Sequence, residues 1–204
     1  MAMAKKKIVK GRPTKFDMQR EKAMKQLAEA RAEGKADGDI AELVDLINSD
    51  KDLYTTSSCA GRVCILETPK EHVKLDSEWL GKWHRKVTLQ DLEGALKKHT
   101  KNVAFLQSEC PILHVVARDL KSAERILFAA QNSGFKRSGI QAINPERVLV
   151  EICSTESLEV PLAEDRRTLV DAEYLKYLVG IANTKFESGR KKLERLQKRV
   201  KVGI

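Results

Sequence analysis

The sequence has few cysteines and no apolar run that approaches the ~20 residues of a membrane span. Four cysteines in 204 residues are too few for a disulfide framework. No CxxC occurs, and no histidine stands at zinc-finger spacing from Cys59 and Cys64. The basic N-terminus contains no apolar segment, so we expect no secretory signal. These absences predict a cytoplasmic protein with reduced thiols, without a membrane partner and without a metal site.

Familiar nucleotide-binding and hydrolase signatures are also missing. The sequence contains neither GxGxxG nor GxxxxGKS/T, and it lacks GxSxG. A Rossmann-type cofactor domain, a P-loop and an α/β-hydrolase are therefore not expected. The composition, 42% hydrophobic and 33% charged, is typical of a globular chain, and its length is sufficient to bury a core in one domain.

The net charge of +9 lies at the two ends of the chain. Residues 1–15 carry six basic groups and no acidic one, and residues 185–201 carry eight basic groups and two acidic ones, which leaves residues 16–184 at −3. We expect a disordered basic arm over 1–15, a catalytic α+β domain over 16–184 and a basic helix end over 185–204. Basic ends on a near-neutral body are suited to a phosphate backbone, although solubilising tails have the same composition.

Hydrophobic periodicity predicts a single α+β domain with mostly antiparallel sheets, packed helices and a long C-terminal helix. Strands do not alternate regularly with helices, which argues against a parallel βαβ series. Helices are expected over 16–31 and 40–48, after the N-caps Thr88 and Asp119, and from Asp171 onward. The last helix is amphipathic at first and then mostly charged, so we expect its second half to project from the body. Strands are expected near residue 54 and over 62–67, 79–87, 104–107, 112–118, 138–143, 147–153 and 160–162, the last a short edge strand because it contains Pro161.

The run of small residues over 55–62 is the most distinctive local pattern. Consecutive Ser and Thr hydroxyls compete for backbone hydrogen bonds and so disfavour a helix, and a glycine permits close approach. Ser57, Ser58, Gly61 and Arg62 therefore favour a site for an anionic or carboxylate-bearing ligand, with Arg62 as a forked donor. A tight turn capped by its own hydroxyls would have the same residues.

Two histidines are candidates for proton transfer. His84 follows Trp83 on the expected strand. The two residues are either a stacking platform beside a proton acceptor or a half-buried tryptophan beside a surface histidine. His114 lies among apolar residues and is either a second candidate base or a hydrogen-bonded core histidine.

Polar residues at other strand ends extend this pattern. Arg118 ends a strand just before a helix N-cap and is placed either to hold a carboxylate or phosphate or to pair with a nearby acid. Ser138 and Gly139 open a later strand, and Ser154 follows the next one. Glu159 could bind ribose hydroxyls or an amino group, or be a surface acid.

These motifs occur together in one known family. The motifs are TTSSCAGR at 55–62, Trp83-His84, Leu113-His114-Val115, Arg118-Asp119-Leu120, Gly134-Phe135 before Ser138-Gly139-Ile140, and Ser154-Thr155 before Leu158-Glu159-Val160-Pro161-Leu162. In this order, over about residues 16 to 195, the chain resembles the wybutosine-synthesis methyltransferases of archaea and eukaryotes. These enzymes are not Rossmann methyltransferases.

The resemblance implies an S-adenosylmethionine-dependent enzyme that methylates N4 of the tricyclic base at position 37 of tRNA-Phe, in the anticodon loop. For this reaction we expect His84 or His114 to accept the ring proton. Cofactor contacts are then expected from Ser57, Ser58, Gly61, Arg62, Ser138, Gly139, Ser154 and Glu159, with a tRNA phosphate as the alternative ligand of the first four. Contacts to the tRNA are expected from Trp83, Arg118, Lys82, Arg85, Lys86, Lys191 and Lys192.

Two other classes fit the same residues. A non-catalytic tRNA-binding module that presents position 37 to another enzyme would also have basic ends, and only cofactor binding separates it from a methyltransferase. An enzyme for an acidic metabolite would use the hydroxyls and arginines without RNA, so salt-dependent tRNA binding excludes it.

Overall fold

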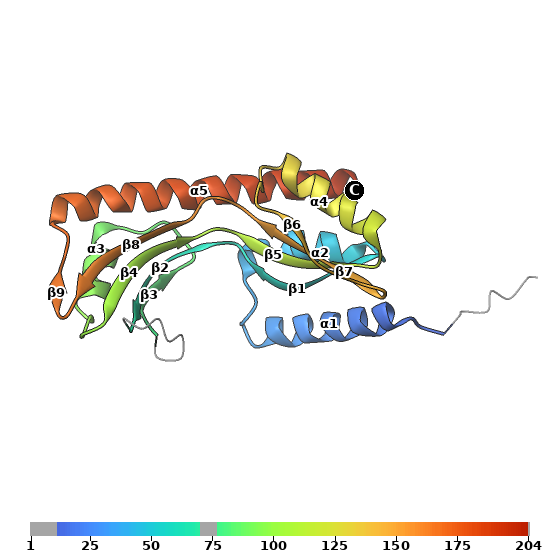
Figure 1. The fold of residues 1–204 in the computed structure, drawn as a ribbon, viewed down its shortest axis with the longest axis horizontal. Coiled ribbons are helices and arrows are strands. Elements are labelled where there is room, and N and C mark those ends of the chain that lie inside the picture. The colour runs from blue at the N-terminus through green and yellow to red at the C-terminus, as the bar shows by residue number, and fades with distance from the viewer. Residues whose placement is uncertain (1–11, 70–76, 204) are drawn as a thin grey trace, which may run out of the picture.

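The computed structural model describes residues 12–69 and 77–203 and shows two antiparallel sheets placed end to end beneath one long helix (Figure 1). In chain order the elements are α1 (Lys15–Ala32), the 3-10 helix η1 (Gly38–Ile40), α2 (Ala41–Ser49), β1 (Leu53–Cys59), β2 (Arg62–Thr68), β3 (Glu78–Trp83), α3 (Leu89–Leu96), β4 (Val103–Glu109), β5 (Ile112–Ala117), α4 (Leu120–Asn132), β6 (Gly139–Asn144), β7 (Arg147–Cys153), β8 (Leu158–Glu164), β9 (Arg167–Thr168) and α5 (Ala172–Val202). The predicted α+β class with antiparallel pairing is confirmed.

The chain passes between the two sheets at one narrow junction. One sheet has the order β1-β5-β7-β6 and the other β3-β2-β4-β8-β9. Strand β1 continues into β2, β4 into β5, and β7 into β8, so the three crossings lie side by side over residues 59–62, 109–112 and 153–158 (Figure 1). We call this junction the waist. Gly61 has φ +88° there, and a Cβ at this position would lie 2.9 Å from the Glu109 carbonyl oxygen, so only glycine fits.

Both faces of the four-stranded sheet are covered by helices. On one face Leu113 and Val115 pack in the main core with residues of α2, α4 and α5. On the other face α1 packs through Phe16, whose ring lies edge-on to Tyr54 at a centroid distance of 5.2 Å. Thr14 and Asp17 form a capping box that begins α1. The expected 1–15 arm lies mostly outside the described residues.

The five-stranded sheet is covered by helices on one face only. Val63, Ile65 and Leu106 point into a second core with α3 and the first half of α5. No helix of the described residues packs on the opposite face of this sheet (Figure 1). Side chains on that face are consequently available to a ligand.

Helix α5 joins the two halves of the molecule along its whole length. Leu193, Leu196 and Val200 are buried in the main core, so the expectation that the second half projects is wrong. At the waist Gly189 passes so close to Pro111 that a Cβ would lie 2.7 Å from the proline ring. The charged second half has a narrow apolar stripe, and that stripe is sufficient to bury the helix on the sheet. No helix within the described ranges is long and apolar enough to span a membrane.

Two strand predictions need correction. The strand expected over 79–87 ends at Trp83, because the backbone of Val87 instead bonds to the side chain of Asn183 on α5 through both its N–H and its carbonyl group. The short edge strand expected at 160–162 is the seven-residue β8. Its neighbour β9 pairs only with Ala163 and Glu164, so Pro161 still lies where no second strand needs its missing N–H.

Candidate functional site

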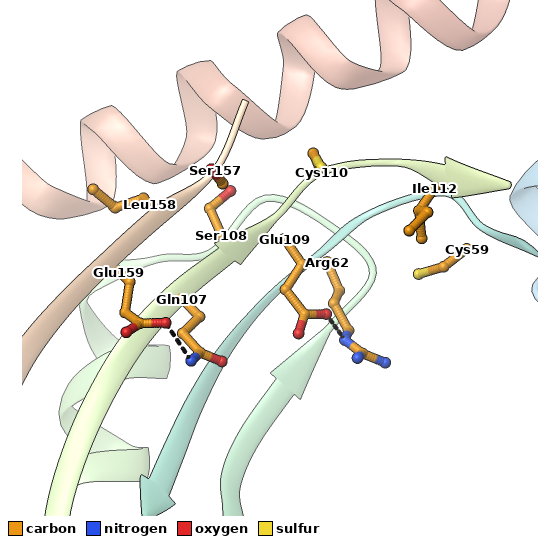
Figure 2. Close-up of a pocket in the computed structure, with 10 residues that line it drawn as sticks. All are labelled: Cys59, Arg62, Gln107, Ser108, Glu109, Cys110, Ile112, Ser157, Leu158 and Glu159. Atoms are coloured by element: carbon orange, nitrogen blue, oxygen red, sulfur yellow. Dashed lines mark hydrogen bonds and ion pairs between the residues drawn. The ribbon is translucent and has the colours of Figure 1, made fainter. Parts of the chain in front are cut away.

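Two hollows adjoin at the waist. The first, which we call the waist hollow, has a volume of about 480 Å³ and is lined by Cys59, Arg62, Gln107, Ser108, Glu109, Cys110, Ile112, Ser157, Leu158 and Glu159 (Figure 2). The second, the α1 hollow, has a volume of about 500 Å³ and lies between α1, the turn before η1, β1 and the end of β3. Its lining includes Asp37, Ser57, Ser58, Lys82 and His84. Cys59 and Arg62 belong to both, and volumes of this size accommodate small ligands.

Arg62 provides a cation at the wall between the two hollows. Its guanidinium forms an ion pair with Glu109 (Figure 2). Burial alone would lower the pKa of Arg62, but the Glu109 carboxylate outweighs this and raises the pKa, so the arginine stays charged. The same guanidinium carbon lies 5.0 Å from the ring centroid of Trp79. Of the predicted residues, Ser57, Ser58, Arg62, Lys82 and His84 are all brought together in the α1 hollow.

His84 faces a carboxylate that sequence reasoning missed. Its Nδ1 lies 3.6 Å from Oδ2 of Asp37, which also accepts the N–H of Ala60 at 2.8 Å. Asp37 comes from the turn before η1 and caps that helix through the Asp39 N–H. Nothing in the spacing of Asp37 and His84 along the sequence indicates the pair.

Cys59 completes a group of three potential metal ligands. Ligand atoms of Asp37, Cys59 and His84 lie within 4.8 Å of one another, and these residue types can bind zinc. Burial raises the pKa of the Cys59 thiol, so in the absence of a cation the sulfur is protonated. Both oxygens of Asp37 already accept backbone N–H groups.

His114 links a serine and a second missed carboxylate across the four-stranded sheet. Ser57 Oγ lies 2.6 Å from its Nδ1, and Glu151 Oε2 lies 3.1 Å from its Nε2. Gln141 donates to the other oxygen of Glu151 at 3.2 Å. His114 is half-buried within this polar chain rather than enclosed in the core. Because β5 pairs with β7, Glu151 stands opposite His114 in register, and this pairing could have been found only once the sheet order was known.

The waist hollow contains one predicted residue besides Arg62. Glu159 accepts a hydrogen bond from Gln107 at 2.9 Å, and both side chains lie on the same side of the strands as Arg62 and Glu109 (Figure 2). Ser108 also lines this hollow, and its buried hydroxyl has no hydrogen-bond partner among the described residues. This hollow therefore presents groups of both charge signs.

Other predicted residues lie outside both hollows and have partners within the fold. Arg118 donates to Asp17 and Asp52, each at 2.7 Å, at the far end of β5. Lys192 is buried and forms an ion pair with Glu156. Trp83 folds back over Gly81 against the second core.

The remaining predicted residues are structural or exposed. Ser138 Oγ accepts the N–H of Cys153 at 3.2 Å, Ser154 is fully buried, and Gly139 begins β6. Arg85 is bound to both carboxylate oxygens of Asp91, and Lys86 pairs with Glu187 at 2.6 Å. Lys191 is exposed on α5.

Comparisons with known proteins extend over nearly the whole chain. A model of the family described as Methyltransferase TYW3 matches residues 18–202. A Thermococcus kodakarensis protein named tRNA(Phe) 7-((3-amino-3-carboxypropyl)-4-demethylwyosine(37)-N(4))-methyltransferase 1 is 42% identical over 91% of this chain and 93% of its own length. A Pyrococcus abyssi protein, methyltransferase 2 of the same name, is 46% identical over 86% of this chain and 85% of its own length.

Two solved structures are similar to this chain over most of its length. The PH1069 protein from Pyrococcus horikoshii superposes with a TM-score of 0.87 at 38% identity, covering 91% of this chain and 95% of that one. A hypothetical protein from Aeropyrum pernix has a TM-score of 0.70 at 28% identity, covering 81% of this chain and 98% of that one. With the motifs at 55–62, 83–84 and 113–115 placed around the waist, the chain belongs to the TYW3 methyltransferase family.

Proposed function

We propose that this methyltransferase transfers a methyl group from S-adenosylmethionine to N4 of 7-(3-amino-3-carboxypropyl)-4-demethylwyosine at position 37 of tRNA(Phe). The names of the relatives from T. kodakarensis and P. abyssi give this nucleoside, this position and methylation at N4. The observation that carries the proposal is the pair of adjoining hollows with a shared wall at Cys59 and Arg62. Methyl transfer needs a donor and an acceptor held in line and in contact, which two adjoining sites provide.

The waist hollow suits the methyl donor. S-adenosylmethionine supplies a methyl group on a positively charged sulfur, and it ends in an ammonium and a carboxylate. Arg62 can bind a carboxylate, while Glu109 and Glu159 can bind an ammonium group and favour a nearby positive charge. The residues present therefore fit this donor.

The α1 hollow is then the site of the tricyclic base. Transfer to a ring nitrogen releases the proton of that nitrogen, and His84 is the acceptor that lines the hollow directly. Asp37 beside Nδ1 favours the tautomer with the proton on Nδ1, which leaves Nε2 free to take the ring proton. His114 reaches the hollow only through Ser57, so we assign it to orienting that hydroxyl.

Contacts to the tRNA backbone are assigned to the exposed cations. Lys82 lies at the edge of the α1 hollow. Arg85 and Lys86 are exposed just after β3, and Lys191 is exposed on α5. We assign Arg118, Trp83, Ser138 and Lys192 to maintaining the framework that holds the two hollows, because their partners lie inside the fold. Ser154 is fully buried and Gly139 begins β6, so we assign both to the same framework.

Labelled S-adenosylmethionine and two tRNA(Phe) samples test the proposal. One sample carries the unmethylated tricyclic base and the other carries unmodified guanosine at position 37. We expect label only in the tricyclic nucleoside of the first sample. Salt-dependent binding of both samples without transfer of label would overturn the proposal and would identify a non-catalytic presenting module.

A further inference from the structure

The uncovered face of the five-stranded sheet carries an exposed tryptophan beside the candidate site. Trp79 on β3 is 42% exposed. A shift of register between Ile65 and Leu66 pairs Trp79 with Leu66 and Trp83 with Val63. Trp83 therefore faces the second core with Val63, whereas Trp79 faces the open side with Arg62 and Lys82. Without that bulge two residues four apart on a strand would share a face.

Two cations flank the exposed ring. The guanidinium carbon of Arg62 lies 5.0 Å from the ring centroid of Trp79, and the Nζ of Lys82 lies 5.8 Å from it. Both distances are within the range of cation–π contacts. Arg62 also pairs with Glu109, so it is held in place, and Lys82 is exposed. An aromatic face beside cations is the arrangement that binds single-stranded nucleic acid, with a base stacked on the ring and phosphates at the cations.

The ring is connected to the reaction site through the same two cations. Arg62 forms the wall between the two hollows, and both Arg62 and Lys82 line the α1 hollow. A base stacked on Trp79 would consequently be a near neighbour of a base held in the α1 hollow. In a single-stranded loop, the neighbouring nucleotides are the ones that reach such a position.

We propose that Trp79, with Arg62 and Lys82, forms a subsite that stacks a nucleobase adjacent to the target nucleotide in the RNA. This inference rests on the proposed function for the identity of the RNA. The subsite supplies affinity and orients the loop, and Trp79 takes no part in the transfer of the methyl group.

Binding of a labelled anticodon stem-loop, measured by fluorescence anisotropy without the methyl donor, tests the subsite. We expect Trp79→Ala to weaken binding by about 5- to 100-fold, the range for loss of one base–aromatic stack, and Trp79→Phe to restore most of it. Tyr177→Ala is the matched control, because Tyr177 is 62% exposed on α5, on the covered side of the molecule. Equal affinity of Trp79→Ala and Tyr177→Ala would overturn the proposal.

Salt dependence and a base probe separate stacking from charge and from misfolding. Trp79→Ala should leave the slope of log K against log salt unchanged, whereas Lys82→Gln should reduce it by about 0.7. With 2-aminopurine on either side of position 37, one probe should be quenched by the wild type and not by Trp79→Ala. If Trp79→Ala keeps the wild-type unfolding midpoint and still quenches the probe, this result contradicts the subsite.

The test of the subsite and the test of the proposed function can fail separately. If the wild type binds RNA through Trp79 but transfers no methyl group, the subsite holds and the proposed function fails. If the wild type methylates the RNA and Trp79→Ala changes neither Kd nor KM, the proposed function holds and the subsite fails.

Discussion

The two sheets of this protein differ in how many faces are covered. The four-stranded sheet lies between α1 on one face and α2, α4 and α5 on the other. Helices cover the five-stranded sheet on one face, and its other face presents Arg62, Trp79 and Lys82. The first sheet therefore acts mainly as a framework and the second offers a surface. The hollows lie where the two meet, so residues from both sheets reach one site.

Each sheet directs a site residue by a break in its register. In β1 the register shifts between Thr55 and Ser57, so that Thr55 faces α2 and bonds to Asn48, while Ser57 faces the opposite side and meets His114. In β2 and β3 the shift exposes Trp79. Bulges of this kind redirect side chains and occur often beside functional sites. Five variants or treatments test the division between framework and surface, beginning with effects on catalysis, continuing with effects on stability and ending with one that should have no effect.

The largest effect is expected at His84, where the five-stranded sheet meets the α1 hollow. His84→Ala should lower kcat by about 10²- to 10⁴-fold because it removes the proton acceptor. Binding of tRNA should be unchanged in an equilibrium assay. Gln90→Ala, an exposed change on α3, is the control and should keep wild-type kcat.

His114→Ala provides the counterpart from the four-stranded sheet. Because His114 acts through Ser57, its loss should lower kcat by only about tenfold. If His114→Ala were the more damaging of the two variants, the proton acceptor would belong to the framework sheet, and the assignment of His84 would be wrong.

The framework role of α1 is tested at Phe16. Phe16 is buried against Tyr54 and the Arg118 guanidinium, so Phe16→Ala should lower the free energy of unfolding by about 3 to 4 kcal/mol. Trp79→Ala, at an exposed position, should lower the free energy of unfolding by less than about 1 kcal/mol. Urea unfolding of both variants measures the difference. Similar losses at both positions would show that the open face is part of the core.

A smaller, pH-dependent effect is expected at Glu67, a buried carboxylate at the end of β2. Burial alone would raise its pKa, but hydrogen bonds from Thr100, Lys101 and Asn102 outweigh this and lower the pKa below 4.5. A lowered pKa stabilises the fold fully above the unfolded value, and this stability is lost as the pH falls through the folded value.

Glu67→Gln should therefore reduce the loss of unfolding free energy between about pH 5 and pH 3. Urea unfolding across this range measures it, with Glu93→Gln on the exposed face of α3 as the control. If the wild type and Glu67→Gln lost stability in parallel, the fold would not lower the pKa of Glu67, and the hydrogen bonds would not outweigh the effect of burial.

No effect is expected from metal removal. Asp37, Cys59 and His84 lie close together, but the neutral thiol and the occupied carboxylate oxygens argue against a metal site. Treatment with a chelator should leave kcat unchanged. Loss of activity that added Zn²⁺ restores would reverse this expectation and would change the role assigned to His84.

The sequence by itself determined the local elements and the motifs. Periodicity located the helices, and the predicted N-caps Thr88 and Asp119 both begin helices. The long last helix begins after Asp171, and the strand starting at 62 follows the small-residue run as expected. These features depend on near neighbours in the chain, so local patterns carry them. The motifs around Ser57, Arg62, His84 and His114 were also visible, because each is a short contiguous segment.

Only the tertiary structure decided which side chains meet. Asp37 approaches His84, and Glu151 meets His114, through turn geometry and sheet order that leave no spacing signal in the chain. The two bulges decided that Ser57 faces the site and that Trp79, not Trp83, is exposed, because a shift of one residue moves every later side chain to the other face. Burial of the charged half of α5 likewise depended on a sheet formed by residues far away in sequence.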